Sequence, residues 1–228
     1  MKRLSESAAL TLLQRSKAAY KRDIKINYEH AAQDCRTCLT PGACCTDAHF
    51  VNVHITRLEA VAMRETLERT PRLDDGARRR IYARAHRAVE RYGLRVTHNE
   101  TGFRQTFSCP LFEPNVGCVV HARAKPAPCI QHACYENWED LPPVEMQWRT
   151  EHNIEALNTR VYQTAWAWLS VPVWLTLVDP HGDSSELARL ETVWRTRRAS
   201  PSEHSDECGN AAYRRRTERR RLPVLFRA

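Results

Sequence analysis

The sequence predicts a helix-rich α+β protein: a small irregular domain in which short strands and a hairpin wrap around a cysteine-ligated metal site. Long stretches repeat apolar residues with the 3.6-residue period of amphipathic helices, whereas only short stretches alternate as strands do. Eight of the nine cysteines fall in two runs. We expect a helical extension over residues 1–32, a cysteine-cluster domain with a C-terminal helix over 33–180, and a basic, disordered tail over 181–228.

Three helices are expected in the first half of the chain. Residues 5–20 begin with Ser5 or Ser7 as a possible N-cap, and residues 77–92 carry an apolar face that ends before Gly93. Between them, Thr56-Arg-Leu-Glu59 has the capping-box pattern and predicts a helix to about residue 69. The face expected to be buried on the first helix consists of Ala9, Leu12, Leu13, Ser16, Ala19 and Tyr20.

The strands are expected to be short. Residues 49–55 alternate apolar and polar side chains, and residues 95–107 read as a hairpin that delivers Cys109. Asn115-Val-Gly117 is a turn that brings Cys118 back near Cys109, and 119–120 is a candidate further strand.

A last helix is expected over residues 150–170, close to a group of tryptophans. Trp166, Trp168 and Trp174 lie near Pro172, and aromatic side chains at such spacing usually pack in a core. The longest apolar stretch, 165–178, is too short and too interrupted to span a bilayer.

The cysteine runs define the candidate site. The predicted metal ligands are the eight clustered cysteines, Cys35, Cys38, Cys44, Cys45, Cys109, Cys118, Cys129 and Cys134. The start of the chain has no apolar stretch of signal-peptide length, so we expect a cytoplasmic protein. Structural disulfides are rare in that reducing compartment, and an odd number of cysteines fits a closed disulfide framework poorly. Metal binding is therefore favoured over disulfides or inert buried thiols.

The spacing of the thiols bears on how many metal ions they hold. Cys35-x-x-Cys38 is a metal knuckle, and the turn Pro41-Gly42 separates it from the adjacent pair Cys44-Cys45. Adjacent side chains of an extended backbone point in opposite directions, so this pair would serve two centres, or two irons of one cluster, more easily than one ion. Eight thiolates make two zinc sites, two iron–sulfur clusters of the 4Fe–4S kind, or one of each.

Histidines beside the cysteines are alternative ligands. His121 follows Cys118 by three residues and His132 lies between Cys129 and Cys134, so either could replace a thiolate, although a position beside the ligands is favoured for both. His49 and His54 are expected to be ordinary strand positions, and Cys208 an unpaired surface thiol.

The order of the cysteines resembles a bacterial cysteine-cluster family described as a zinc- or iron-chelating domain, the CxxCxxCC or YkgJ-like family. Residues 35–45 match its Cys-x-x-Cys-x-x-Cys-Cys block, except that five residues separate Cys38 from Cys44. Cys109-Pro-Leu-Phe112 matches its Cys-Pro-Phe-Leu element, and residues 118–134 follow the order of its last three cysteines. His121, Lys125 and Ile130 stand where that family has Tyr, Arg and Arg.

The resemblance covers residues 33–136 and implies metal chelation. It also implies a link to redox or radical chemistry, because some relatives are described as iron–sulfur oxidoreductases and the flagellin lysine methylases carry a similar block. The first functional expectation is a metal-binding protein that holds an iron–sulfur cluster or zinc. The alternatives are an iron–sulfur-dependent redox or group-transfer enzyme, oxidoreductase or methylase-like, and a zinc-stabilised interaction module.

The positive charge of the chain belongs mainly to its last segment. Residues 195–228 hold ten arginines against four acidic residues, a net charge of +6 out of +8 for the chain. Nucleic acid or an acidic protein could bind this tail, but only Tyr213 accompanies the arginine clusters, so a base-stacking platform is absent. The sequence contains no phosphate-binding glycine loop, nucleophile elbow or His-Glu-x-x-His motif.

Overall fold

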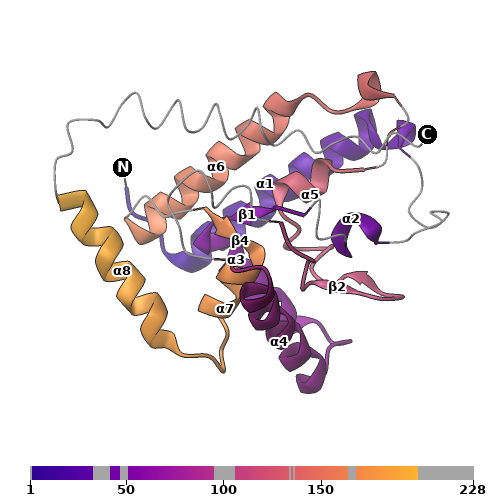
Figure 1. Cartoon of the computed structure of the whole chain (residues 1–228). Coiled ribbons are helices and arrows are strands. Elements are labelled where there is room, and N and C mark those ends of the chain that lie inside the picture. The colour runs from indigo at the N-terminus through magenta and orange to yellow at the C-terminus, as the bar shows by residue number, and fades with distance from the viewer. Residues whose placement is uncertain are drawn as a thin grey trace.

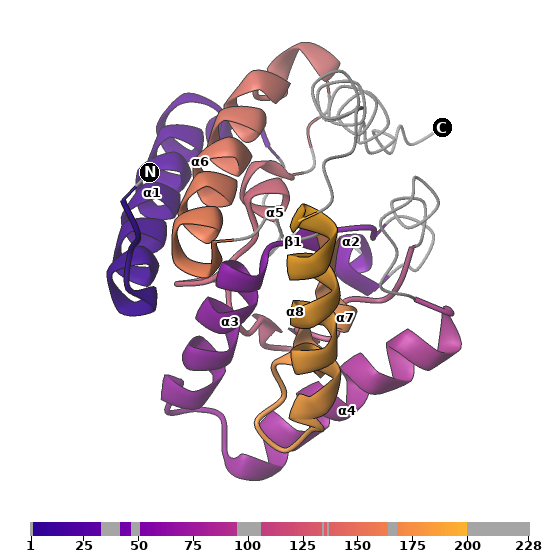
Figure 2. The same cartoon turned by 90° about the vertical axis from the view of Figure 1, so that its left-hand side faces the viewer.

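A computed structural model describes residues 2–32, 42–46, 51–94, 106–133, 135, 137–163 and 168–199. Across these residues the protein is helix-rich, with a few short antiparallel strands, as the predicted α+β class requires. Helix α1 (Glu6–Asn27) lies along α6 (Val144–Tyr162), and α4 (Asp75–Arg91) packs on α7 (Val171–Leu177) (Figures 1 and 2). Helix α3 (Arg57–Arg69) contacts α1, α6 and α7 and so joins the two pairs.

Helix α1 begins where the sequence predicts, and Ser5 is its N-cap, accepting a hydrogen bond from the amide of Ala8 at 3.3 Å. The predicted face is only partly correct. Ala9, Leu13 and Tyr20 are buried, but Leu12 is exposed, and the buried turn between Leu13 and Tyr20 is occupied by a lysine. A short 3₁₀ helix, η1 (Glu29–Ala31), follows.

The next two helices confirm the local signals. Helix α3 has the predicted capping box, in which Thr56 and Glu59 satisfy each other's free backbone amides. Helix α4 begins two residues earlier than expected because Asp74 caps it, accepting from the Ala77 amide at 2.6 Å. Gly93 follows the end of α4 with φ +59°, a left-handed conformation that glycine adopts without strain.

Strand pairing accounts for the main differences from prediction. Of residues 49–55, only β1 (His54–Ile55) is a strand among those described, and it pairs antiparallel with β4 (Leu169–Ser170). The last helix, predicted over 150–170, instead spans Val144–Tyr162 and ends at Gln163, whose φ is +58°. Residues 169–170 are therefore strand, because the β1 edge supplies hydrogen-bond partners that a local pattern cannot reveal.

The second cysteine run forms a small hairpin. Strands β2 (Phe112–Glu113) and β3 (Gly117–Cys118) pair antiparallel around the predicted turn, with Asn115 and Gly117 at positive φ. The strand predicted at 119–120 is wrong, since these residues lie in turns. Helix α5 (Ala127–Gln131) follows, and then a 3₁₀ helix, η3 (Trp138–Asp140). Residues 95–105, including most of the predicted hairpin over 95–107, lie outside the described part of the chain.

The end of the described chain is helical. Helix α8 (Ser184–Ala199) lies within the range 181–228 that we expected to be a flexible tail, and Leu190 and Trp194 are buried on it. The Trp194 ring meets that of Trp174 with centroids 6.3 Å apart. Trp174 and Trp168 are buried, as predicted, whereas Trp166 and residues 200–228 fall outside the description. No helix in the described ranges is long and apolar enough to cross a membrane.

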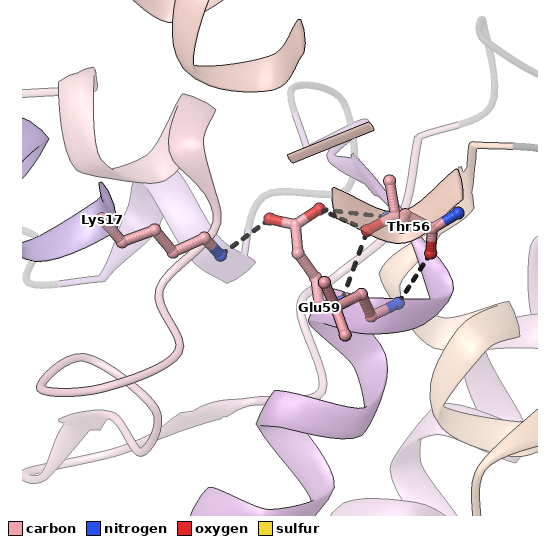
Figure 3. Close-up of polar contacts among 5 residues, drawn as sticks. Lys17, Thr56 and Glu59 are labelled. Atoms are coloured by element: carbon pink, nitrogen blue, oxygen red, sulfur yellow. Dashed lines mark hydrogen bonds and ion pairs between the residues drawn. The ribbon is translucent and has the colours of Figure 1, made fainter. Parts of the chain in front are cut away.

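A buried ion pair joins α1 to α3. The Lys17 ammonium donates to Glu59 Oε1 at 2.7 Å, and the two side chains are 5% and 1% exposed (Figure 3). The other carboxylate oxygen of Glu59 accepts from the Thr56 amide at 3.0 Å, so one carboxylate serves both the capping box and the lysine. The lysine on the apolar face of α1 is thus compensated by a partner 42 residues further along the chain.

Candidate metal centre

Five of the eight predicted ligands are described, and separate segments present them. Cys44 and Cys45 lie on the single-turn helix α2 (Ala43–Thr46), Cys109 precedes β2, Cys118 ends β3, and Cys129 lies on α5. All five are half-buried free thiols. Cys44 and Cys45 are helical rather than extended, so the premise that their side chains point in opposite directions is wrong, and both can face the same region.

Backbone hydrogen bonds fix α2 against the segment that carries Cys109. The Cys109 amide donates to the Cys45 carbonyl oxygen at 2.7 Å, and the Ser108 hydroxyl donates to the Thr46 carbonyl oxygen at 2.7 Å. The Tyr92 hydroxyl is 3.2 Å from the Ser108 hydroxyl, which ties this contact to the end of α4. The two cysteine runs are therefore joined directly, residue to residue.

Gly42 allows the start of α2 to lie close to the β2–β3 hairpin. Gly42 precedes α2 with φ +81°, and a Cβ built there would lie 1.9 Å from the ring of Phe112 on β2. Both the backbone conformation and the space therefore require glycine at this position. Gly42, at the described end of the turn predicted from the sequence, thus lies close against the hairpin that holds Cys118.

An arginine from α4 clamps the hairpin. Arg84 donates through Nε and Nη2 to the Pro110 carbonyl oxygen at 3.0 and 2.9 Å, and through Nη2 to Glu113 at 2.6 Å. Phe112 pairs with Cys118 across the hairpin, and the Val119 amide donates to the Leu111 carbonyl oxygen at 3.0 Å. The turn after Cys109 is held at both ends, so Cys109 and Cys118 keep a fixed relation.

Helix α5 is held in place by its last residue. Gln131 donates to the Pro142 carbonyl oxygen at 2.9 Å and accepts a hydrogen bond from the Tyr20 hydroxyl of α1. Beyond α5, Tyr135 forms an isolated antiparallel bridge with Ala32. Tyr135, which follows Cys134 in the sequence, is therefore paired with Ala32, which precedes Cys35 by three positions.

The described thiols lie near enough to one another to shift each other's pKa values. Hydrogen bonds from the Cys45 thiol and from His132 lower the pKa of Cys44. Burial raises the pKa of Cys109, and the negative charges that Cys118 and Cys129 would carry raise it further.

The pKa of Cys129 is raised for the same reasons as that of Cys109. Burial is the main cause that raises its pKa, to about 12, and the charges of Cys118 and Cys44 add to the rise. The pKa of Cys45 is raised first by its hydrogen bond to Cys44 and then by burial. Burial and mutual repulsion therefore oppose the formation of several thiolates together, and a nearby cation would offset both effects.

The described side chains do not by themselves complete a coordination shell. Within the described ranges, no three Cys, His, Asp or Glu side chains are arranged to hold a metal ion as they stand. Cys35, Cys38 and Cys134, three of the predicted ligands, lie outside those ranges, as do Cys208 and His49. The donors that are described, soft thiolates and one imidazole, are the ligand types that zinc and iron–sulfur clusters take.

His132, His121 and His54 lie in different surroundings. His132 is exposed and interacts with Cys44, so it remains a candidate ligand. His121 is exposed beside a cluster of lysines. His54 is buried on β1 with Nδ1 2.6 Å from the Asn52 carbonyl oxygen.

The sequence did not predict the residues that position the segments carrying the cysteines. The Pro-Gly dipeptide gave a signal for the turn at Gly42, but not for its contact with Phe112. Arg84 carried no signal at all, because it is one of many arginines on α4 and only the fold reveals its carbonyl partner.

Comparison of the chain with protein-family models, with curated proteins and with solved structures finds no match.

Proposed function

We propose that the protein binds a metal through its clustered cysteines, as an iron–sulfur cluster or as zinc. The observation that carries the proposal is that four segments with five of the cysteines lie side by side. The Cys109 amide donates to the Cys45 carbonyl oxygen at 2.7 Å, and Cys44, Cys45, Cys109, Cys118 and Cys129 influence one another's pKa values in pairs, although these described thiols alone do not form a three-donor site. Burying five thiols together has little value for packing alone, since small apolar side chains would fill the same space without a titratable group.

The ligand chemistry fits this proposal. Thiolates are soft donors that select zinc and iron–sulfur clusters over magnesium or calcium. A bound cation would replace the protons of the thiols and offset both the burial and the mutual repulsion that raise their pKa values. Cys35, Cys38 and Cys134 would complete the eight-thiolate set, as the resemblance to the cysteine-cluster family implies. Iron–sulfur is favoured slightly, because Cys109-Pro110 is similar to the Cys-Pro ending of ferredoxin runs.

The test is the metal and acid-labile sulfide content of protein purified without oxygen, together with its visible spectrum. Iron with matching sulfide and broad absorption that bleaches on reduction would establish the cluster and make a redox or group-transfer activity worth assaying. Stoichiometric zinc without sulfide would establish a structural site, which suits an interaction module. Protein with neither metal, and with thiols that titrate fully, would refute the proposal.

A matched pair of variants makes the assay specific. Cys109→Ser removes a buried thiol of the cluster, and we expect it to lose at least about half of the bound metal. Cys208→Ser removes the one cysteine outside both runs and should retain all of it. Equal metal content in the two variants would contradict the assignment of Cys109 as a ligand.

A further inference from the structure

A pocket lies close to the described thiols, between α1 and the chain that follows Cys118. It is a half-open pocket of about 410 Å³. Its basic lining comes from α1 and the loop before α5. It consists of the cations Lys17, Lys21, Arg123 and Lys125, with the imidazole of His121 beside them. Ile130 and two alanines provide the apolar part. No acidic side chain lines it.

The cations of this pocket differ in how they are compensated. Lys17 is neutralised by its buried ion pair with Glu59. Within the described part of the chain, Lys21, Arg123 and Lys125 form no ion pair with a carboxylate. Three uncompensated cations that converge from two elements on one hollow create a positive potential there, which water screens only partly in a concave site.

The pocket and the thiol cluster share one stretch of chain. The His121 amide donates to the Cys118 carbonyl oxygen at 3.0 Å, and Ile130 follows Cys129 on α5. Lys125 is close enough to Cys129 to oppose, by its charge, the rise in pKa that burial causes. A ligand in the pocket would therefore lie next to the proposed metal centre.

We propose that this pocket binds a small organic anion that carries phosphate or carboxylate groups. The charges select an anion, because lysine and arginine donate charge-assisted hydrogen bonds to such oxygens. The volume and the apolar lining select a molecule with an organic body, since a bare inorganic ion would leave most of the space to water. The inference is independent of which metal the thiols bind.

The competing explanation is that the lysines only balance the negative charge of a thiolate–metal centre. The two explanations differ in an observable way. Charge balance predicts that removing Lys125 lowers metal content and that no anion binds, whereas a ligand site predicts saturable binding of an anion that depends on Lys21, Arg123 and Lys125 together.

The experiment is isothermal titration calorimetry of the full chain, with its bound metal, at constant ionic strength. The probes are citrate for carboxylates and adenosine monophosphate for phosphates, with inorganic phosphate as the reference without an organic body. We expect saturable one-to-one binding of at least one organic probe, tighter than that of inorganic phosphate. Lys125→Gln and Arg123→Gln should each weaken it about tenfold, the effect of losing one charge-assisted hydrogen bond.

Controls keep the result interpretable. Lys25→Gln removes an exposed charge from the same helix, α1, outside the pocket lining, and should leave the affinity unchanged. Circular dichroism melting confirms that each variant is folded, and metal content is measured on the same samples. No binding of either organic probe up to about 10 mM would overturn the inference, as would equal weakening by Lys25→Gln. If protein purified without oxygen contains no metal but still binds the anion, the proposed function is refuted and this inference stands.

Discussion

The buried pair of Lys17 and Glu59 allows a quantitative test of the fold. Both charges are almost fully removed from water, so neither can be rehydrated when its partner is lost. Lys17→Met keeps the length of the side chain and leaves the Glu59 carboxylate with only its capping-box partner. Removing one member of a buried pair typically costs 3–5 kcal/mol, so we expect a loss of about 4 kcal/mol in the free energy of unfolding. A domain has roughly 5–15 kcal/mol in total, so the change is large.

The assay is a double-mutant cycle by urea unfolding. Glu59→Gln keeps a side chain that can complete the capping box but leaves the Lys17 ammonium unpaired, so it should cost a similar amount. In the double variant no charge is buried, and its loss should be close to that of one single change rather than to the sum of two. The denaturation midpoint of each single variant should fall by about 1–2 M urea.

An exposed pair provides the control. Arg64 and Glu68 are 3.8 Å apart on α3, and their side chains are 33% and 49% exposed. Their coupling in the same cycle should be below about 0.5 kcal/mol. If the effects at Lys17 and Glu59 add, or if either single change costs less than about 1 kcal/mol, then the two charges are hydrated and the packing of α1 on α3 is not as described.

Two further changes test what positions the thiols. Gly42→Ala should destabilise the protein and lower its metal content, because the new methyl group meets an aromatic ring at 1.9 Å. The control is Gly93→Ala, which also has a positive φ but nothing within 4 Å of the new methyl group. It should lower the free energy of unfolding by only about 1 kcal/mol and keep the metal. Metal analysis and urea unfolding of both variants measure this, and equal metal loss would contradict the close packing of α2. Arg84→Met should weaken metal retention against a chelator about tenfold or more, since the clamp on the hairpin is lost, whereas the exposed Arg87→Met should not. Identical chelation rates would contradict the role of Arg84.

Local signals in the sequence predicted the helices well. The capping box at Thr56 and the glycine after α4 fix helix ends through neighbouring residues, and the structure contains both. The burial of Lys17 was not predictable, because it depends on a carboxylate from another helix. The end of α6 was missed for the same reason, since Leu169 is drawn into a strand by its pairing with β1.

In the candidate site, too, local sequence patterns indicated some features, whereas contacts between distant segments could not be predicted. Clustering along the sequence gave the eight candidate cysteines, of which the structure describes five, and the turn at Asn115 predicted that Cys118 returns toward Cys109. The sequence could not reveal that Cys45 meets Cys109 through a backbone hydrogen bond, because that contact joins segments separated by more than 60 residues. It also gave no sign of the pocket beside the thiols, which exists only because α1 lies along the loop that carries Arg123.

The bridge between Ala32 and Tyr135 has a consequence for synthesis of the chain. It closes a loop of about 100 residues, at an entropic cost on the order of 4 kcal/mol. A ribosome adding about 5–20 residues each second takes roughly 5–20 s to extend the chain from Ala32 to Tyr135. During that interval the thiols of the first run are exposed on a nascent chain without those of the second. Oxidants and stray metal ions have this window in which to react with them, and under the proposed function the correct metal would be needed only once the second run has been synthesised.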